Sequence, residues 1–225
     1  MKERKKKLLK LIIENYIKTV EPVGSKFLAN SGSLDVSAPT VRNEMRELES
    51  EGFLTHPHTS AGRIPTEKGY KFYVENIIKP VGIGEFKEVL EKSEIVNFEG
   101  CDRVKKIAQE VAEFLNNAVF VAFNSNSVYY TGISNLFSQP EFKNHINTLN
   151  TSVMFDKCEE IVYNLLGKIE QNKTSVLIGR ENPLGSSCSS IIARFGEEGL
   201  FILIGPTRMD YEKNIAILKF LISKL

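Results

Sequence analysis

The sequence has 225 residues, of which 42% are hydrophobic and 25% are charged, values of an ordinary globular protein that exclude a disordered chain or one continuous coiled coil. Residues 1–80 hold 14 Lys and Arg against 10 Asp and Glu, whereas the remaining 145 residues hold 15 against 18. A basic first part beside an acidic remainder favours a polyanion as the partner of the first part.

The N-terminus, MKERKKKLLKLIIENYI, is basic and then apolar, as in a signal peptide. Lys10 and Glu14 interrupt the apolar part, however, and no small-residue cleavage site follows. No apolar run approaches the roughly 18 residues of a membrane-spanning helix. Three widely spaced cysteines argue against a disulfide framework and for a reducing compartment. We therefore expect a cytoplasmic protein with no membrane partner.

Three helix patterns follow one another in the first 50 residues. Apolar residues recur at nearly helical spacing over residues 4–19, and Pro22 prevents that helix from continuing. Ser25 is expected to cap a second, short helix. Ser37 and Gly52 are the residue types favoured just before and just after a helix, and they bound the third. Its buried stripe is expected to be Val41, Met45 and Leu48.

A small hairpin follows the third helix. Residues 53–56 are expected to form a short strand, residues 57–63 (PHTSAGR) a turn-rich loop, and Ile64 the start of the return strand. Thr66 is placed to cap a further helix that ends before Pro80. Three helices, a two-stranded hairpin and a fourth helix are the order of a winged helix-turn-helix domain, assigned to residues 1–80.

The rest of the chain mixes helices and strands. Residues 81–102 are expected to be a linker with a short helical piece, followed by an amphipathic helix over 103–118. Strands are expected at AVFVAF, SVYYTGI, TSVLIG, SCSSIIARF and GLFILIG, and the chain closes on a helix capped by Asp210. Arg208 and Asp210 are interpreted as a pair that fixes this last corner. The sequence thus predicts an α+β protein, with its second domain over residues 103–225.

The outward face of the third helix carries side chains suited to base recognition. At 100° per residue Asn43 and Arg46 lie opposite the buried stripe, with Arg42 on the flank. In a helix-turn-helix the second helix of the motif enters the major groove, and residues near its N-terminus reach base edges. The predicted contacts of this helix are Ser37, Pro39, Thr40, Arg42, Asn43 and Arg46.

Two further segments are predicted to contact DNA. Ser25 and Lys26 begin the second helix, where backbone N–H groups and a charge favour phosphate. The loop of the hairpin is small and polar and carries an arginine, the residue favoured in the minor groove. Its predicted contacts are His58, Thr59, Ser60 and Arg63.

Other uses of these residues stay open. In a winged helix that binds proteins instead of DNA, Arg42 and Arg46 would pair with Glu44 or Glu49 across helical turns. The glutamates of the third helix would repel phosphate if turned toward it. Arg208 is open to a ligand anion as well as to a structural pair.

The sequence gives little support for a metal site or a catalytic site. His56 and His58 have no third zinc ligand nearby. Cys188, in the segment LGSSCSSII, is more simply a small strand or loop residue than a nucleophile. We predict no metal, no cofactor and no enzymatic activity.

Several segments resemble the HrcA family of heat-inducible transcription repressors: EPVGSKFLA, VSAPTVRNEMRELESEGFLTHPHTSAGRIPTEKGYKFYV, YYTGISNLFSQPEF, IGRENP and IGPTRMDYEKNIAILKFL. The resemblance covers roughly residues 5–78 without an evident gap and roughly 128–225. It implies a winged-helix DNA-binding domain followed by a GAF-like α+β domain. It also implies a homodimer that represses chaperone operons through an inverted-repeat operator, supported by a GroEL-type chaperonin.

The middle of the chain departs from the family pattern. Full-length members carry a long block, including an inserted dimerisation element, between the helix near residue 115 and YYTGISNLF, and here NNAVFVAFNSNS stands in its place. The chain therefore resembles a shortened member. The alternative function is a winged-helix interaction module that has lost operator binding together with the block.

Overall fold

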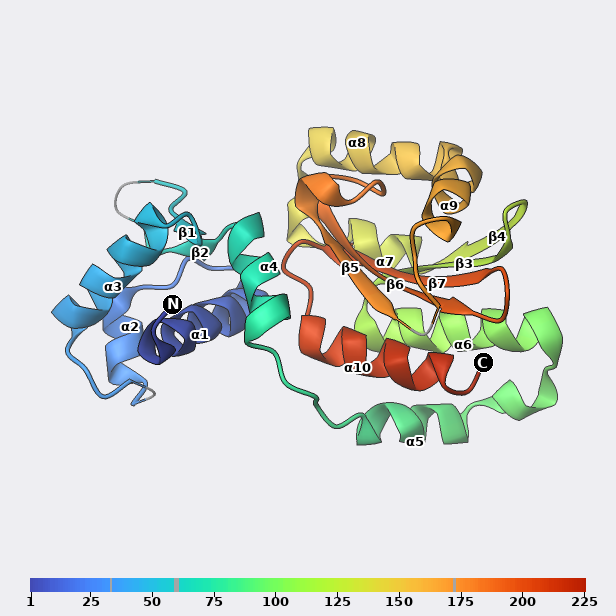
Figure 1. Ribbon diagram of the computed structural model, residues 1–225, viewed down its shortest axis with the longest axis horizontal. Coiled ribbons are helices and arrows are strands. Elements are labelled where there is room, and N and C mark those ends of the chain that lie inside the picture. The colour runs from blue at the N-terminus through green and yellow to red at the C-terminus, as the bar shows by residue number, and fades with distance from the viewer. Residues whose placement is uncertain (33, 59–60, 172) are drawn as a thin grey trace. The chain divides into compact units, whose positions relative to one another are not determined.

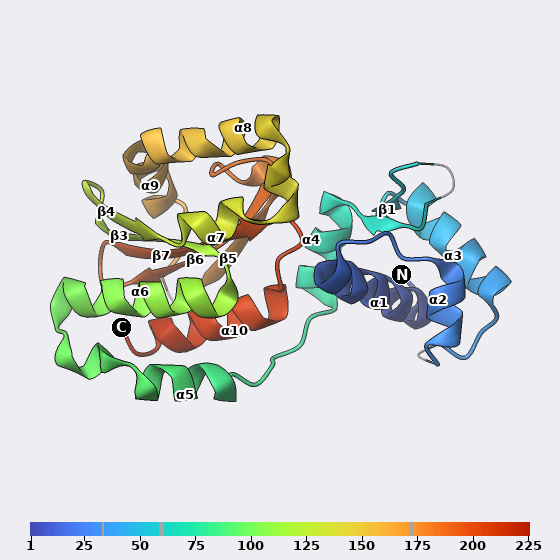
Figure 2. The ribbon, with the colours of Figure 1, turned by 180° about the vertical axis from the view of Figure 1, so that it is seen from behind.

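The computed structural model describes residues 1–225 except 33, 59–60 and 172, and it divides the chain into two compact units, Met1–Lys79 and Pro80–Leu225 (Figures 1 and 2). Each unit is described by itself. The prediction of a mixed helix and sheet protein is confirmed. Within the described residues, no helix is both long enough and apolar enough to cross a bilayer.

The first unit consists of three helices, a two-stranded antiparallel hairpin and a fourth helix. Its elements are α1 (Glu3–Thr19), α2 (Ser25–Asn30), α3 (Ala38–Ser50), β1 (Leu54–Thr55), β2 (Ile64–Pro65) and α4 (Glu67–Asn76). Its core combines one face of α1 with the stripe of α3 and two tyrosines of α4. The buried residues include Leu8, Leu9, Ile12, Ile13, Leu28, Val41, Met45, Leu48, Leu54, Tyr70 and Tyr73.

Local sequence signals explain where α3 and α4 begin and end. Ser37 is the N-cap of α3, and Gly52 has a φ of +80°, a left-handed conformation that suits glycine. The Gly52 N–H donates to the Glu49 carbonyl and the Phe53 N–H to the Leu48 carbonyl, each at 2.9 Å, which closes the helix as a Schellman motif. The Thr66 hydroxyl accepts the N–H of Gly69 at 3.1 Å, as predicted for the cap of α4. The expected Ser25 cap is wrong, since Gly24 is the N-cap of α2 and Ser25 its first residue.

The second unit is built on a five-stranded antiparallel sheet in the order β4-β3-β7-β6-β5. The strands are β3 (Ala118–Asn124), β4 (Ser127–Thr131), β5 (Thr174–Ile178), β6 (Cys188–Phe195) and β7 (Gly199–Pro206). The main helices are α5 (Gly84–Lys92), α6 (Gly100–Leu115), α7 (Ile133–Phe137), α8 (His145–Asp156), α9 (Cys158–Leu166) and α10 (Tyr211–Ile222). Short 3-10 turns lie at Glu94–Asn97, Pro140–Lys143 and Gly179–Glu181.

Helices cover both faces of this sheet. Figure 1 shows α6 and α10 on one face and α8 and α9 on the other, and Figure 2 shows the same layers from behind. The central strands are therefore buried along nearly their whole length, which explains why β7 is apolar without alternation. The core on the α8 and α9 side gathers Phe120, Ile192, Ile202, Leu136, Met154 and Val162, among others.

Residues 81–102, expected to be a linker with a short helical piece, contain α5, and the buried Phe86 of α5 packs against Phe114 with 5.2 Å between ring centroids. One expectation for the second unit is corrected. Arg208 pairs with Glu141 instead of Asp210, through a 3.2 Å contact between Nη2 and Oε2 and a further bond from Nε. Asp210 is used as the cap of α10 and accepts the Lys213 N–H at 3.1 Å.

Candidate nucleic-acid interface

A groove of about 580 Å³ opens on the first unit between the start of α2, the exposed face of α3 and the base of the hairpin. It brings together five of the predicted DNA contacts from three separate segments, Ser25, Lys26, Arg42, Arg46 and Arg63. The remaining lining residues are Val23, Gly24, Met45, Ala61 and Gly62. Four of the five predicted contacts are cationic, so the groove suits an anionic partner.

The other predicted residues of α3 lie on its exposed side. Ser37 and Pro39 are exposed at the N-terminus of the helix, where the Ser37 and Thr40 hydroxyls are 3.0 Å apart. Thr40 and Asn43 border a separate hollow of about 400 Å³ that faces the N-terminus of α1. The exposed side of α3 therefore has two flanks, one along the hairpin and one along α1.

Cations of α1 pair with the acidic side chains of α3. The Lys5 ammonium lies 2.7 Å from the Glu47 carboxylate and 2.9 Å from that of Glu51, and Arg4 pairs with Glu44. Hydrogen bonding with Lys5 lowers the pKa of Glu47, and the bond to Glu47 raises the pKa of Lys5. Two glutamates of the helix and Glu51 at its C-cap are thus compensated inside the unit.

The fourth glutamate, Glu49, binds the hairpin. Its carboxylate accepts the Arg63 guanidinium at 2.9 Å from Nε and 2.8 Å from Nη2, and it also bonds to Nδ1 of His56. Burial opposes ionisation of Glu49, but the bonds to His56 and Arg63 outweigh it and lower the pKa of the carboxyl group. Glu49 therefore holds the residue that follows β1 and the residue that precedes β2 against α3.

Arg42 and Arg46 differ from these cations. Both side chains are exposed, and over residues 1–225 apart from the four undescribed positions neither forms an ion pair. The alternative in which they pair with Glu44 or Glu49 is not what the structure contains, because Arg4 and Arg63 occupy those carboxylates. Two unpaired guanidinium groups therefore face the groove.

The hairpin contacts have a mixed outcome. Arg63, predicted as a DNA contact of the loop, directly precedes β2 at the base of the hairpin, and its guanidinium is bonded to Glu49. Arg63 contributes positive charge to the groove, but its bond to Glu49 gives it a structural role that holds the hairpin against α3. His58 is exposed in the loop, and Thr59 and Ser60 lie outside the described residues.

Gly62 is essential to the groove but was not singled out from the sequence. Val23 and Arg63 form an antiparallel bridge, with both N–H···O distances at 2.9 Å, which ties the segment before α2 to the hairpin. A Cβ at Gly62 would stand 2.5 Å from the backbone carbonyl of Val23, so only glycine permits this approach. The only sequence signal was the small pair Ala61–Gly62 beside Arg63.

The metal and nucleophile alternatives fit the structure poorly. His56 is bonded to Glu49, and no group of three potential metal ligands occurs among the described residues. Cys188 is fully buried, and burial raises the pKa of its thiol to about 12. A thiol in that state is not a thiolate near neutral pH.

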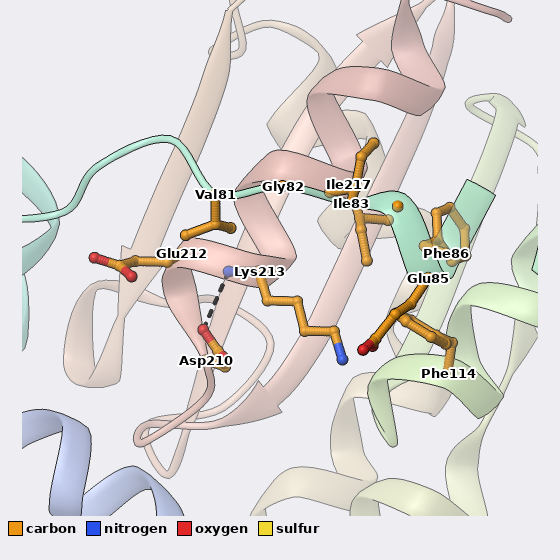
Figure 3. Close-up of a pocket in the computed structure, with 11 residues that line it drawn as sticks. Val81, Gly82, Ile83, Glu85, Phe86, Phe114, Asp210, Glu212, Lys213 and Ile217 are labelled. Atoms are coloured by element: carbon orange, nitrogen blue, oxygen red, sulfur yellow. Dashed lines mark hydrogen bonds between the residues drawn. The ribbon is translucent and has the colours of Figure 1, made fainter. Parts of the chain in front are cut away.

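A hollow of about 500 Å³ in the second unit lies between α5, α6 and α10 (Figure 3). In Figure 3 the Lys213 side chain extends along it, and the ammonium lies 4.1 Å from the centre of the Phe114 ring. Asp210 is engaged in capping α10. Unlike Arg42 and Arg46 of the first unit, Lys213 already has an intramolecular partner, the Phe114 ring.

These features define a class of protein: a two-unit α+β chain whose first unit has the element order of a winged helix and a cationic groove, and whose second unit is a helix-covered antiparallel sheet. A family model described as the HrcA protein C terminal domain matches residues 73–215. The chain belongs to the HrcA family.

Two relatives show how the chain relates to longer members. The heat-inducible transcription repressor HrcA of Acetivibrio thermocellus is 33% identical over 216 residues, which are 96% of this chain, and the chain spans 57% of that protein. The protein of the same name from Desulforudis audaxviator is 26% identical over an alignment of 332 residues that covers 99% of this chain and 96% of that protein. Since this chain has 225 residues, at least 107 aligned positions (332 − 225) have no counterpart in it.

A solved structure supports the fold. The crystal structure of a hypothetical protein matches with a TM-score of 0.76, covering 100% of this chain and 97% of that chain at 17% identity. At that identity the likeness concerns the fold alone.

Proposed function

We propose that this protein is a transcriptional repressor that binds an inverted-repeat operator of heat-shock chaperone operons as a homodimer. The observation that carries the proposal is the state of the charges around α3. Glu47, Glu49 and Glu51, which were expected to repel phosphate if turned toward it, are engaged by Lys5 or Arg63, and Glu44 is engaged by Arg4. Among the described residues, Arg42 and Arg46 have no ion-pair partner. The names of the relatives, heat-inducible transcription repressors, support the same role.

The proposed mode of binding follows from the groove and from the exposed face of α3 beside it. Arg46 and Asn43 of α3 would meet base edges in the major groove, with Arg42 on the same face. Lys26 and the backbone at Ser25 would meet phosphate. Two copies would place their α3 helices about one helical turn of DNA apart, or a multiple of it, which calls for a palindromic site.

The test is binding of the purified full chain to three duplexes: the inverted repeat of a chaperone operon, the single half-site and a scrambled sequence. We expect the inverted repeat to bind at least about 1,000-fold more tightly than the scrambled duplex. Affinity for every duplex should fall as salt rises, because phosphate contacts release counterions. Equal affinity for all three duplexes would contradict operator recognition and favour the interaction-module alternative.

A chaperonin of the GroEL type is proposed as a second partner that supports the active repressor. Its contribution is measured by the fraction of protein competent to bind the operator, titrated with and without chaperonin and ATP. A higher active fraction with chaperonin is expected, and no change would remove this partner from the proposal without affecting DNA recognition.

A further inference from the structure

Helix α8 presents an apolar stripe on the outside of the second unit. Ile146, Leu149 and Val153 are 65%, 53% and 44% exposed, and their spacing of three and four residues places them on one face. The opposite face holds the buried Thr151 and Met154 against the core. Figure 1 shows α8 over the face of the sheet remote from α6 and α10. Three adjacent exposed aliphatic side chains on one helix indicate a contact surface.

The charge around the stripe limits what can cover it. Along α8, HINTLNTSVMFD, the only titratable side chains are His145 at the first position and Asp156 at the last. Exposed Lys143 precedes the helix, whereas Lys157, Glu159 and Glu160, all exposed, follow Asp156. The stripe is therefore uncharged, with a basic N-terminal end and a net acidic C-terminal end.

This pattern is complementary to itself when reversed. In an antiparallel pair of α8 helices the basic end of each would lie beside the acidic end of the other, and the two helix dipoles would oppose. Ile146 lies three residues before Leu149 and Val153 lies four residues after it. A two-fold axis near Leu149 therefore places Ile146 of one copy beside Val153 of the other copy. A parallel arrangement would place like ends together.

We propose that α8 is a contact surface between two copies of this chain, packed antiparallel about a two-fold axis near Leu149. This proposal specifies a contact surface for the homodimer of the proposed function. Its biological role rests on that proposed function. Twelve residues of helix span about 18 Å, so this contact buries less than the roughly 1,200 Å² of a stable interface. The pair should therefore be reversible, with a dissociation constant of about micromolar or weaker, and two operator half-sites would strengthen it.

The first test is sedimentation equilibrium of the full chain without DNA, from about 1 to about 500 μM. Leu149→Glu should raise the dissociation constant of the pair at least about 30-fold, as loss of a central contact does. Tyr163→Glu on α9 is the matched control, because it adds the same charge where a larger side chain is 70% exposed. It should change the constant less than about threefold. A monomer throughout the range, or equal weakening by both variants, would overturn the proposal.

Cross-linking tests the antiparallel arrangement. In a Cys101→Ser, Cys158→Ser background a short bis-maleimide should link Leu149→Cys to itself. Ile146→Cys and Val153→Cys should be linked to each other in a mixture more than either is to itself. If Ile146→Cys and Val153→Cys each form as much product with themselves as with each other, or more, the two-fold geometry is refuted. The buried Cys188 does not compete in this reaction.

The half-site duplex separates the two proposals. Leu149→Glu should bind a half-site as the unmodified chain does, while losing its advantage on the full inverted repeat. If the unmodified chain pairs through α8 but distinguishes no duplex from the scrambled one, operator binding fails and the α8 contact stands. If it recognises the operator but Leu149→Glu keeps the full advantage, the α8 contact fails and DNA recognition stands.

Discussion

Arg46 and Arg63 border the same groove but are held differently, and this predicts different consequences of replacing each with alanine. Arg46 is exposed and lacks an ion pair within the described residues, so Arg46→Ala should change the free energy of unfolding by no more than about 0.5 kcal/mol. Arg63 makes two bonds of 2.8 and 2.9 Å to Glu49, and both side chains are mostly covered. Arg63→Ala should lower the free energy of unfolding by about 1–2 kcal/mol, because a partly buried carboxylate loses its arginine.

The effects on DNA should differ as well. If Arg46 makes a bidentate contact with a base, Arg46→Ala removes about 1–3 kcal/mol of binding free energy, roughly a 5- to 150-fold loss on the operator, with little change on a scrambled duplex. Lys26→Ala is the matched control at the same groove. It should weaken both duplexes alike and reduce the slope of log affinity against log salt by about 1, as loss of a phosphate contact does.

Fluorescence anisotropy on both duplexes over a salt series, together with urea unfolding of each variant, provides the measurements. Unchanged operator affinity for Arg46→Ala, or an equal loss on both duplexes, would show that this arginine does not recognise bases. An Arg63→Ala variant as stable as the parent would show that the bond to Glu49 carries no stability, and the interpretation of Arg63 as a brace would be abandoned.

Three further predictions follow from the same structure. Gly62→Ala should abolish the bridge to Val23 and lower operator affinity by at least about tenfold, seen as loss of protection of the Val23 amide in hydrogen exchange; retained protection would contradict the steric argument. The pKa of Glu49 is lowered in the folded state, so its stabilisation is present above the ordinary value near 4.5 and is lost as pH falls through the lowered value. Below pH 4.5 the free energy of unfolding of the unmodified chain should therefore fall more steeply with pH than that of Glu49→Gln. Parallel plots of unfolding free energy against pH for the two proteins would refute this. Maleimide should modify exposed Cys101 in the native protein but leave Cys188 unmodified until unfolding, and fast native labelling of Cys188 would contradict its burial.

Local signals in the sequence were sufficient to predict most elements. Gly52, Thr66 and Asp210 mark helix ends through bonds to groups within a few residues, and Ser37 marks the start of α3 by its N-cap position, so no knowledge of the tertiary structure is needed. The face of α3 that carries Arg46 was likewise predictable, because helical periodicity alone separates it from the buried stripe.

Long-range contacts, in contrast, were decided only by the tertiary structure. Lys5 meets Glu51 across 46 residues and Arg208 meets Glu141 across 67, and composition cannot tell which of many opposite charges will pair. In the first unit, pairing with Arg4, Lys5 and Arg63 determines whether the glutamates around α3 repel a polyanion. The close approach of the Val23 backbone explains why residue 62 is glycine. The sequence by itself determined which side chains are available to bind DNA, and the tertiary structure decided which of them are left unpaired, because pairing depends on distances between segments far apart in the chain.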